Sequence, residues 1–293
     1  MMRTLLPFRA LNTLENVEYL DGLIALVQRA ARGVIGRGAA KDVLHGVPMG
    51  HPLHPLAVQL PIGAWTSAVV LDIVPGAQRS SEALLAIGIV SALPAMAAGW
   101  TDWAELHPQQ QRVGLVHAAA NVSGTLLFAM SWVLRRQGHQ SRGAAVSAAA
   151  LATITLGGTL GGHLAYRLAA GANHAEEVPH LVAPGWQGLA KLADLPVEKL
   201  EKRALGDVPL LVWRSASGSV SVLSNKCSHL AGPLDEGVVM SPGPNPCVEC
   251  PWHHSRFSLA TGEVVQGPAT SPQAAFKTRV VGGVVEICLP HAG

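Results

Sequence analysis

Charge, aromatic side chains and cysteine are all scarce in this 293-residue sequence. Charged residues make up 14% of it, aromatic residues 4% and hydrophobic residues 49%, and the mean hydropathy is +0.30. These values lie on the membrane side of the average for soluble domains. The formal net charge is only +2, without a basic cluster that contains interleaved aromatics, so we expect no nucleic-acid partner. At this length two domains are the natural expectation.

The few cysteines are confined to the last third of the chain, at positions 227, 247, 250 and 288. This distribution does not suggest a disulfide framework. Met1 to Ala10 also lacks a sustained apolar run. We therefore predict that a cleavable signal peptide is absent.

Charged side chains are missing altogether from four long windows of the first half. These windows, without Asp, Glu, Lys or Arg, are 43–71, 83–101, 113–134 and 143–166. Each provides the roughly 20 apolar residues that a bilayer-spanning helix requires. The predicted spans are approximately 56–74, 83–100, 113–134 and 144–167. Before them, residues 15–35 predict an amphipathic helix that lies along a surface.

The C-terminal third predicts a small antiparallel β domain. Residues 210–213 and 220–223 flank a Ser-Ala-Ser-Gly turn, and residues 274–281 and 284–289 flank Gly282-Gly283. Between the two halves, a Pro-containing stretch without an apolar period predicts an extended tether. The expected divisions are an N-terminal amphipathic region at 1–42, a membrane domain at 43–168, the tether at 169–186 and the β domain at 187–293.

Two boxes of cysteine and histidine lie within the predicted β domain. Cys227-Ser228-His229 is a C-x-H box and Cys250-Pro251-Trp252-His253 is a C-x-x-H box. Two thiolates and two imidazoles suit a soft or borderline metal. One alternative is a structural zinc site that uses Cys227, Cys247, Cys250 and a histidine, because Cys247-x-x-Cys250 also has zinc spacing.

This double box resembles the Rieske iron–sulfur family over roughly Trp186 to Leu289. The resemblance implies a [2Fe–2S] cluster with Cys227 and Cys250 on one iron and His229 and His253 on the other. It also implies that Ser255, Phe257 and Pro268 influence the cluster: the first two stand at positions that tune its potential, and Pro268 lies in a covering loop. Quinol-oxidising members often carry an extra cysteine in each box. Their absence here favours the ferredoxin-like branch.

A second group of candidate residues lies in the membrane half. It comprises His51, His54, His117, Asn121 and His163. In four antiparallel spans the histidines would gather at one end, and histidine in a membrane segment is costly enough to suggest a function. Three interpretations stay open. They are bis-histidine ligation of haem b by His117 and His163, with His51 or His54 as substitutes; a quinol pocket in which histidine accepts the proton; and interfacial histidines bonded to backbone carbonyls. This half, about 40–170, resembles an uncharacterised bacterial family of four-helix membrane proteins through its His51-Pro52-Leu53-His54-Pro55 and Gly161-Gly162-His163 segments.

Together these features predict an α + β protein of two domains, a four-helix transmembrane bundle followed by a small antiparallel β Rieske domain. We expect a multi-pass protein of the bacterial cell membrane that carries electrons rather than acting as a stand-alone catalyst. The donor would be quinol or haem b in the lipid bilayer, and a redox protein would be the partner. The alternatives are an iron–sulfur sensor or scaffold that acts through partner binding, and a subunit of a quinol-oxidising complex. A cytoplasmic position of the β domain is favoured, because neither disulfides nor an N-terminal twin-arginine signal is seen.

Overall fold

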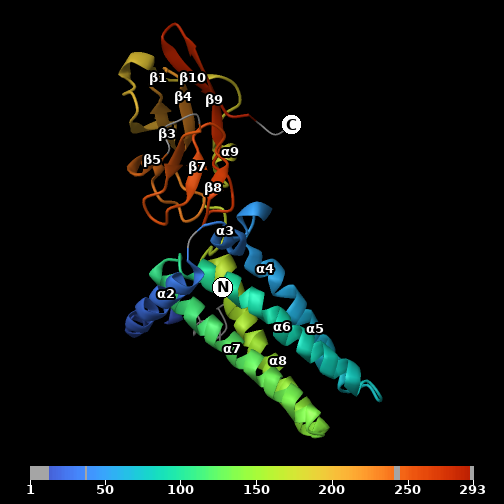
Figure 1. The fold of residues 1–293 in the computed structure, drawn as a ribbon. Coiled ribbons are helices and arrows are strands. Elements are labelled where there is room, and N and C mark those ends of the chain that lie inside the picture. Colours follow the sequence, from blue (N-terminus) through green and yellow to red (C-terminus); the bar gives the residue numbers. More distant parts are fainter. Residues whose placement is uncertain (1–12, 37, 241–244, 291–293) are drawn as a thin grey trace, which may run out of the picture. The chain divides into compact units, whose positions relative to one another are not determined.

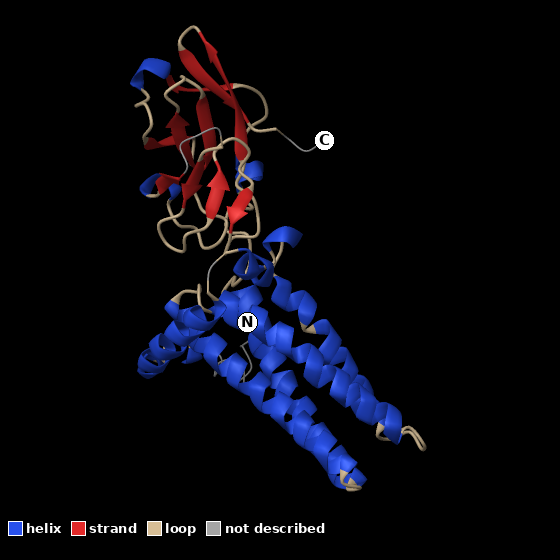
Figure 2. Cartoon of the chain, in the orientation of Figure 1, coloured by secondary structure: helices blue, strands red, loops and turns tan. Residues whose placement is uncertain are grey.

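The computed structural model describes residues 13–36, 38–240 and 245–290. The chain divides into two compact units, one of Met1–Arg37 with Pro52–Ala170 and one of Gly38–His51 with Gly171–Gly293. Figures 1 and 2 show that the first is helical and that the second contains the strands. The prediction that a signal peptide is absent concerns Met1 to Ala10, which lie outside the described residues.

Long helices that run beside one another form the first unit (Figure 1). Its elements are η1 Glu18–Leu20, α2 Asp21–Ile35, α4 Leu53–Ala57, α5 Gln59–Leu71, α6 Gln78–Trp103, α7 Pro108–Arg136, α8 Gln140–Gly162 and η3 His163–Arg167. Helix α5 packs along α6, and α7 packs along α8. The core includes Trp65, whose ring stacks on Phe128 with centroids 4.5 Å apart. A side chain at Gly88 would overlap the Trp65 indole, so only glycine fits there.

Three helices in the described part of the chain are long and apolar enough to cross a membrane. They are Gln78–Trp103, Pro108–Arg136 and Gln140–Arg167, and they correspond to the last three predicted spans. The first predicted span, 56–74, is broken instead, because Val58 separates α4 from α5. Pro61 has no N–H to donate to Ala57, so the helical ladder of hydrogen bonds is interrupted at this point. The predicted count of four continuous spanning helices is therefore not confirmed.

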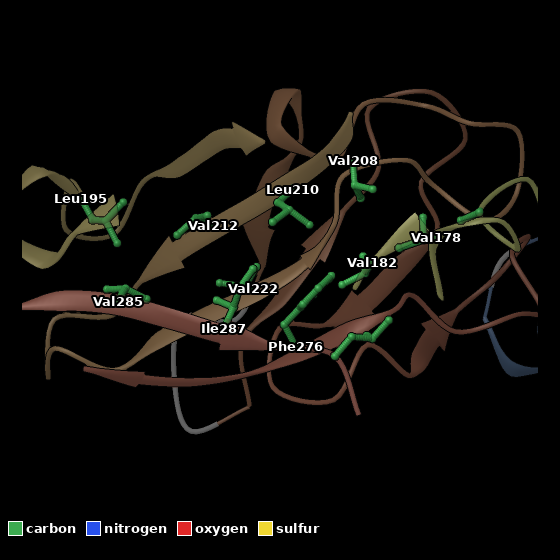
Figure 3. Close-up of a cluster of buried hydrophobic side chains, with 12 residues drawn as sticks. Val178, Val182, Leu195, Val208, Leu210, Val212, Val222, Phe276, Val285 and Ile287 are labelled. Carbon is green, nitrogen blue, oxygen red and sulfur yellow. The ribbon is translucent and has the colours of Figure 1, made fainter. Parts of the chain in front are cut away.

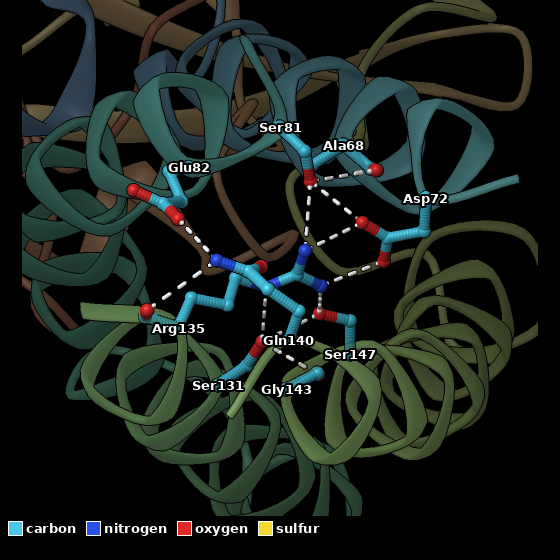
Figure 4. Close-up of polar contacts among 9 residues, drawn as sticks. All are labelled: Ala68, Asp72, Ser81, Glu82, Ser131, Arg135, Gln140, Gly143 and Ser147. Carbon is cyan, nitrogen blue, oxygen red and sulfur yellow. Dashed lines mark hydrogen bonds and ion pairs between the residues drawn. The ribbon is translucent and has the colours of Figure 1, made fainter. Parts of the chain in front are cut away.

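A buried ion pair joins helices α5 to α8 at the end of the bundle where α5 ends (Figure 4). The Arg135 guanidinium binds both carboxylate oxygens of Asp72, at 2.6 and 2.7 Å. The two side chains are only 2% and 8% exposed. Ser81 donates to Asp72, and Arg135 donates to Ser131 and Ser147. The buried charges are thus both paired and hydrogen-bonded, which is the condition under which burial of an ion pair is tolerated.

The second unit contains two antiparallel sheets. The strands are β1 Gln187–Lys191, β2 Leu200–Leu205, β3 Val208–Arg214, β4 Val220–Ser224, β5 Val238–Met240, β6 Cys247–Glu249, β7 Arg256–Ser258, β8 Val264–Gln266, β9 Ala275–Val281 and β10 Val284–Cys288. One sheet has the order β1-β10-β9-β4-β3-β2 and the other β5-β6-β7-β8. The two predicted hairpins are confirmed as β3–β4 and β9–β10. The four-stranded sheet carries the second Cys-His box between β6 and β7.

The segment predicted to be an extended tether is packed over much of its length. Ala175, Val178 and Val182 are buried with Leu210 and Phe276 in the core of the second unit, and Figure 3 shows Val178 and Val182 within this cluster. Their spacing of three and four residues is that of one helical face, and Val178–Leu181 forms the short helix α9. The apolar residues are too few to form a periodic pattern that sequence reasoning would detect.

A segment from far earlier in the chain completes the second unit. Gly38–His51 contains α3 Ala39–His45 and η2 Val47–Met49. The expected boundary at residue 42 falls inside α3. His45, at the end of this helix, is 1% exposed.

Removal of one partner of the buried pair should destabilise the helical unit strongly. Asp72→Ala leaves the Arg135 charge buried and uncompensated, so we expect a loss of about 3–5 kcal/mol, measured by unfolding in detergent. Asp72→Leu combined with Arg135→Leu removes both charges and should recover most of that loss. Arg136→Ala, at an exposed neighbouring position, is the control. An Asp72→Ala protein as stable as the control would contradict this role.

Candidate metal centre

The first Cys-His box is a tight loop after β4. The Cys227 N–H donates to the Gly232 carbonyl at 2.9 Å, and the Ala231 N–H donates to the Cys227 carbonyl at 2.8 Å. Ala231 has a φ of 61°, a left-handed conformation that is uncommon for a residue with a Cβ. The loop thus closes on itself within six residues.

The second box repeats this backbone pattern between β6 and β7. The Cys250 N–H donates to the Ser255 carbonyl at 2.8 Å, and the His254 N–H donates to the Cys250 carbonyl at 3.2 Å. His254 also has a φ of 61°. In both loops the left-handed residue is the fourth after the cysteine, so two unrelated stretches of sequence form matching loops. Backbone strain that recurs in this way is typical of functional sites.

These loops bring like side chains together in pairs. Cys227 and Cys250 are 1% and 2% exposed, and the Sγ of Cys250 lies 2.9 Å from where a Cβ at Gly232 of the first loop would be. The rings of His229 and His253 have centroids 5.0 Å apart and planes at 85°. With metal–nitrogen bonds of about 2.0–2.1 Å, two imidazoles on one tetrahedral ion have centroids about 5 Å apart. The four predicted ligands therefore fit a metal centre with one pair of sulfurs and one pair of nitrogens.

The grouping of these donors bears on the choice between one metal ion and two. The two cysteines lie in one buried cluster, and the two imidazoles contact each other. Among the described residues, three or more His, Cys, Asp or Glu side chains do not converge closely enough to hold one metal ion. Cys247, the additional ligand of the zinc alternative, points its thiol at the Asn245 carbonyl, 3.6 Å away. A pair of thiols and a pair of imidazoles fits a centre with two irons, whereas the thiol of Cys247 does not join them as the zinc alternative with that residue requires.

The contact between the two thiols changes their acidity in opposite directions. The hydrogen bond with Cys250, assisted by burial, raises the pKa of Cys227 well above its ordinary value. The same hydrogen bond lowers the pKa of Cys250 to about 7. Cys250 is therefore the thiol of the pair that ionises first. The thiolate is the form that binds metal.

Two further predicted residues, Ser255 and Pro268, lie together next to the second loop. Ser255 is fully buried, and its Oγ accepts the Ala269 N–H at 2.9 Å. The preceding Gly267 N–H donates to Asp42 Oδ1 at 2.9 Å. The loop that contains Pro268 is therefore held on one side by the second box and on the other by α3. Phe257 is also fully buried, where it packs with Leu211, Trp213 and Leu234 in the hydrophobic core.

The sequence analysis missed three residues that fix these loops. Asp42 is one, and it lies 225 residues from its partner Gly267. The other two come from the segment taken for a tether: the His174 N–H donates to the Ser228 carbonyl at 2.9 Å, and Glu177 pairs with Lys226 at 2.7 Å. Both contacts adjoin Cys227. Contacts over such separations leave no local sequence signal.

The histidines predicted in the membrane half are only partly brought together. His54 and His117 lie side by side, with ring centroids 6.2 Å apart. Asn121 contacts His117 one helical turn away. His163 instead lies 2.9 Å from Glu15, and His51 belongs to the second unit. The structure thus pairs His117 with His54, and it places His163 with a different partner.

Comparison with known proteins identifies both halves of the chain. Residues 185–278 match the family model of the Rieske [2Fe-2S] domain. Residues 50–174 match the family model described as predicted membrane protein (DUF2231). The chain belongs to the Rieske [2Fe-2S] family, and it carries in addition this membrane domain. These matches support a [2Fe–2S] cluster and a membrane domain.

Among curated proteins, the β domain is similar to ferredoxin subunits of dioxygenases. It is 31% identical over 101 residues to the 3-phenylpropionate/cinnamic acid dioxygenase ferredoxin subunit of Escherichia coli (strain K12), a match that covers 34% of this chain and 91% of that protein. The anthranilate 1,2-dioxygenase ferredoxin subunit of Burkholderia cepacia is 29% identical over 102 residues, which cover 35% of this chain and 90% of that one. Among solved structures, the ferredoxin of carbazole 1,9a-dioxygenase from Nocardioides aromaticivorans IC177 is 28% identical and matches 36% of this chain and 98% of that chain, with a TM-score of 0.33.

A pair of cysteine substitutions should separate the cluster from the zinc alternative. Cys250→Ser removes a proposed ligand, so we expect it to abolish the iron, the acid-labile sulfide and the EPR signal of the reduced protein. Cys247→Ser, three residues earlier, is the matched control and should retain all three. Bound zinc in the wild-type protein that is lost in Cys247→Ser would contradict the two-iron assignment.

Loss of the Asp42 carboxylate should loosen the loop that contains Pro268. Asp42→Ala removes the acceptor of the Gly267 N–H, and hydrogen bonds to charged groups contribute about 1.5–3 kcal/mol. We expect faster hydrogen exchange at Gly267 and Ala269 and faster loss of the cluster. Asp207→Ala, in the exposed turn between β2 and β3, is the control. Equal exchange in the two variants would show that α3 does not support this loop.

Proposed function

We propose that this protein is a membrane-anchored electron carrier in which Cys227, His229, Cys250 and His253 hold a Rieske [2Fe–2S] cluster. The observation that carries the proposal is the meeting of the two loops, with the imidazole rings 5.0 Å apart, both cysteines in one buried cluster and the Sγ of Cys250 against Gly232 of the first loop. When bound, such a cluster supplies one-electron transfer at a higher potential than an all-cysteine cluster does, about −150 to +300 mV against about −400 mV.

The cysteine side and the histidine side of the proposed site differ in solvent exposure. Both thiols are buried, so the protein excludes water from the sulfur side of the site. On the histidine side, Trp252 is 46% exposed and its ring lies 6.4 Å from that of His253. An exposed aromatic side chain is a frequent component of a protein–protein contact. We propose that the redox partner binds over this side, as the similarity to dioxygenase ferredoxin subunits supports.

In the membrane domain we propose four spans rather than three. Helices α4 and α5 together extend from Leu53 to Leu71, which at 1.5 Å per residue is about 28 Å, close to the thickness of the hydrocarbon core. The break at Val58 lies beside α6, against which both helices pack, so neighbouring protein surrounds the interrupted backbone. We place the β domain, from about residue 187 onward, on the cytoplasmic side of the bacterial membrane.

We propose that electrons enter from the membrane, from quinol or from haem b, and leave to a redox protein. The fusion of an electron-transfer domain to a membrane domain supports a redox partner within the membrane, because a carrier that served only soluble partners needs no membrane domain. The structure does not pair His117 with His163, the two residues predicted as haem ligands: His117 lies beside His54, and His163 lies beside Glu15. Turnover of a quinol by the purified protein with an added acceptor tests the membrane donor.

The potential of the cluster should depend on Ser255. Its Oγ accepts the Ala269 N–H, and its O–H would donate to the bound cluster and so stabilise the reduced, more negative state. A hydrogen bond to a charged group contributes about 1.5–3 kcal/mol, so Ser255→Ala should lower the one-electron potential by about 60–130 mV. Protein-film voltammetry measures this shift.

Ser258→Ala, three residues away in β7, is the control for this measurement. It should leave the potential of the wild-type protein unchanged. Equal potentials for Ser255→Ala and Ser258→Ala would refute the role of Ser255. A wild-type value near that of all-cysteine clusters would contradict histidine ligation itself.

A further inference from the structure

Two histidines of the membrane domain are oriented in the way that metal-binding histidines are. His54 Nδ1 lies 2.8 Å from the Ala95 carbonyl of α6, and His117 Nδ1 lies 2.7 Å from the Gly157 carbonyl of α8. A carbonyl oxygen can only accept, so each Nδ1 carries the proton and each Nε2 keeps its lone pair. Metal-ligating histidines almost always donate their second ring N–H to a carbonyl or carboxylate in this manner.

Close packing holds both rings in these orientations. A Cβ at Gly99 would lie 2.8 Å from the His54 ring, and one at Gly161 would lie 3.1 Å from the His117 ring. Asn121 donates to the His117 carbonyl at 2.8 Å, and its amide nitrogen lies 3.3 Å from both nitrogens of the ring. The G-x-x-x-G pair of α8 that contains Gly157 and Gly161 thus makes room for Asn121 and His117.

The separation of the rings suggests one atom between them. Their centroids are 6.2 Å apart and their planes stand at 79°. Two imidazoles joined by a direct hydrogen bond of about 2.8 Å have centroids about 5 Å apart. Two imidazoles on opposite sides of one metal atom, with bonds of about 2.0 Å, have centroids about 6 Å apart. The observed distance agrees with the second arrangement.

The number of protein ligands distinguishes a bare metal ion from the iron of a haem. A bare ion held by two imidazoles needs further ligands, whereas the iron of a haem receives four from its tetrapyrrole and takes only two axial ligands from the protein. Facing helices of a bundle are a common source of such a pair. His54 comes from α4, and His117 comes from α7.

We propose that His54 and His117 are the two axial ligands of one haem iron in the membrane domain. This rests on the proposed function, because it identifies the membrane component that exchanges electrons with the cluster. Of the ligands named from the sequence it keeps His117 and takes His54, named there as a substitute, in place of His163, which contacts Glu15. Asn121, through its contacts with His117, is a positioning residue.

The test uses the full chain, produced with added haem precursor and purified in detergent. The pyridine haemochrome assay should give about one haem b per chain, and the reduced protein should show the sharp bands of six-coordinate haem. His54→Ala and His117→Ala should each lose these bands, and free imidazole should restore them in both. His163→Ala, as the matched control, should keep them.

Two outcomes would overturn the proposal. One is wild-type protein without haem after production with the precursor. The other is retention of the six-coordinate spectrum in His54→Ala or His117→Ala without added imidazole. EPR of the Rieske cluster in the same samples distinguishes failure of the haem proposal from failure of the proposed function. The proposed cluster ligands lie in the other unit, so the cluster signal would persist in protein without haem.

Discussion

The site depends on the approach of two short loops that carry like donors to the same place. Each loop is closed by the same two backbone hydrogen bonds, and each requires a non-glycine residue, Ala231 or His254, in a left-handed conformation. Strain of this kind costs of order 1–3 kcal/mol per residue and persists only where the surroundings enforce it. The surroundings here are the packed core that includes Phe257 and both cysteines. The fold therefore brings the cysteines and the imidazoles of the two loops together.

Support for these loops comes from segments that adjoin the membrane domain in the chain. Asp42 holds the loop that contains Pro268, and Glu177 and the His174 N–H hold the first box. The segments before and after the block Pro52–Ala170 thus both contribute to the β domain. Within the helical unit, the Asp72–Arg135 pair and its serines join four helices at one end. Buried polar groups stabilise a fold only when each donor and acceptor has a hydrogen-bond partner. This network therefore favours the one arrangement of the helices in which its members are paired.

Sequence reasoning could predict the features whose signals are local. The C-x-H and C-x-x-H boxes, the two hairpins and three of the spans are each encoded in a continuous stretch. The break at Val58 also has a local signal, Pro61, but the long uncharged window around it predicts a continuous span. By contrast, the contact of Asp42 with Gly267 and the pairing of His117 with His54 depend on how distant segments meet. Topology placed the histidines at one end of the bundle but did not determine which two would be neighbours.

The central claim is that two imidazoles and two thiolates hold one iron–sulfur cluster. Pulsed EPR of the reduced protein tests it most directly, because it detects the magnetic coupling of the cluster to individual ligand nitrogens. The structure predicts two strongly coupled imidazole nitrogens in the wild-type protein. In His229→Cys it predicts one. A spectrum without strongly coupled nitrogen would contradict the assignment of His229 and His253 as ligands.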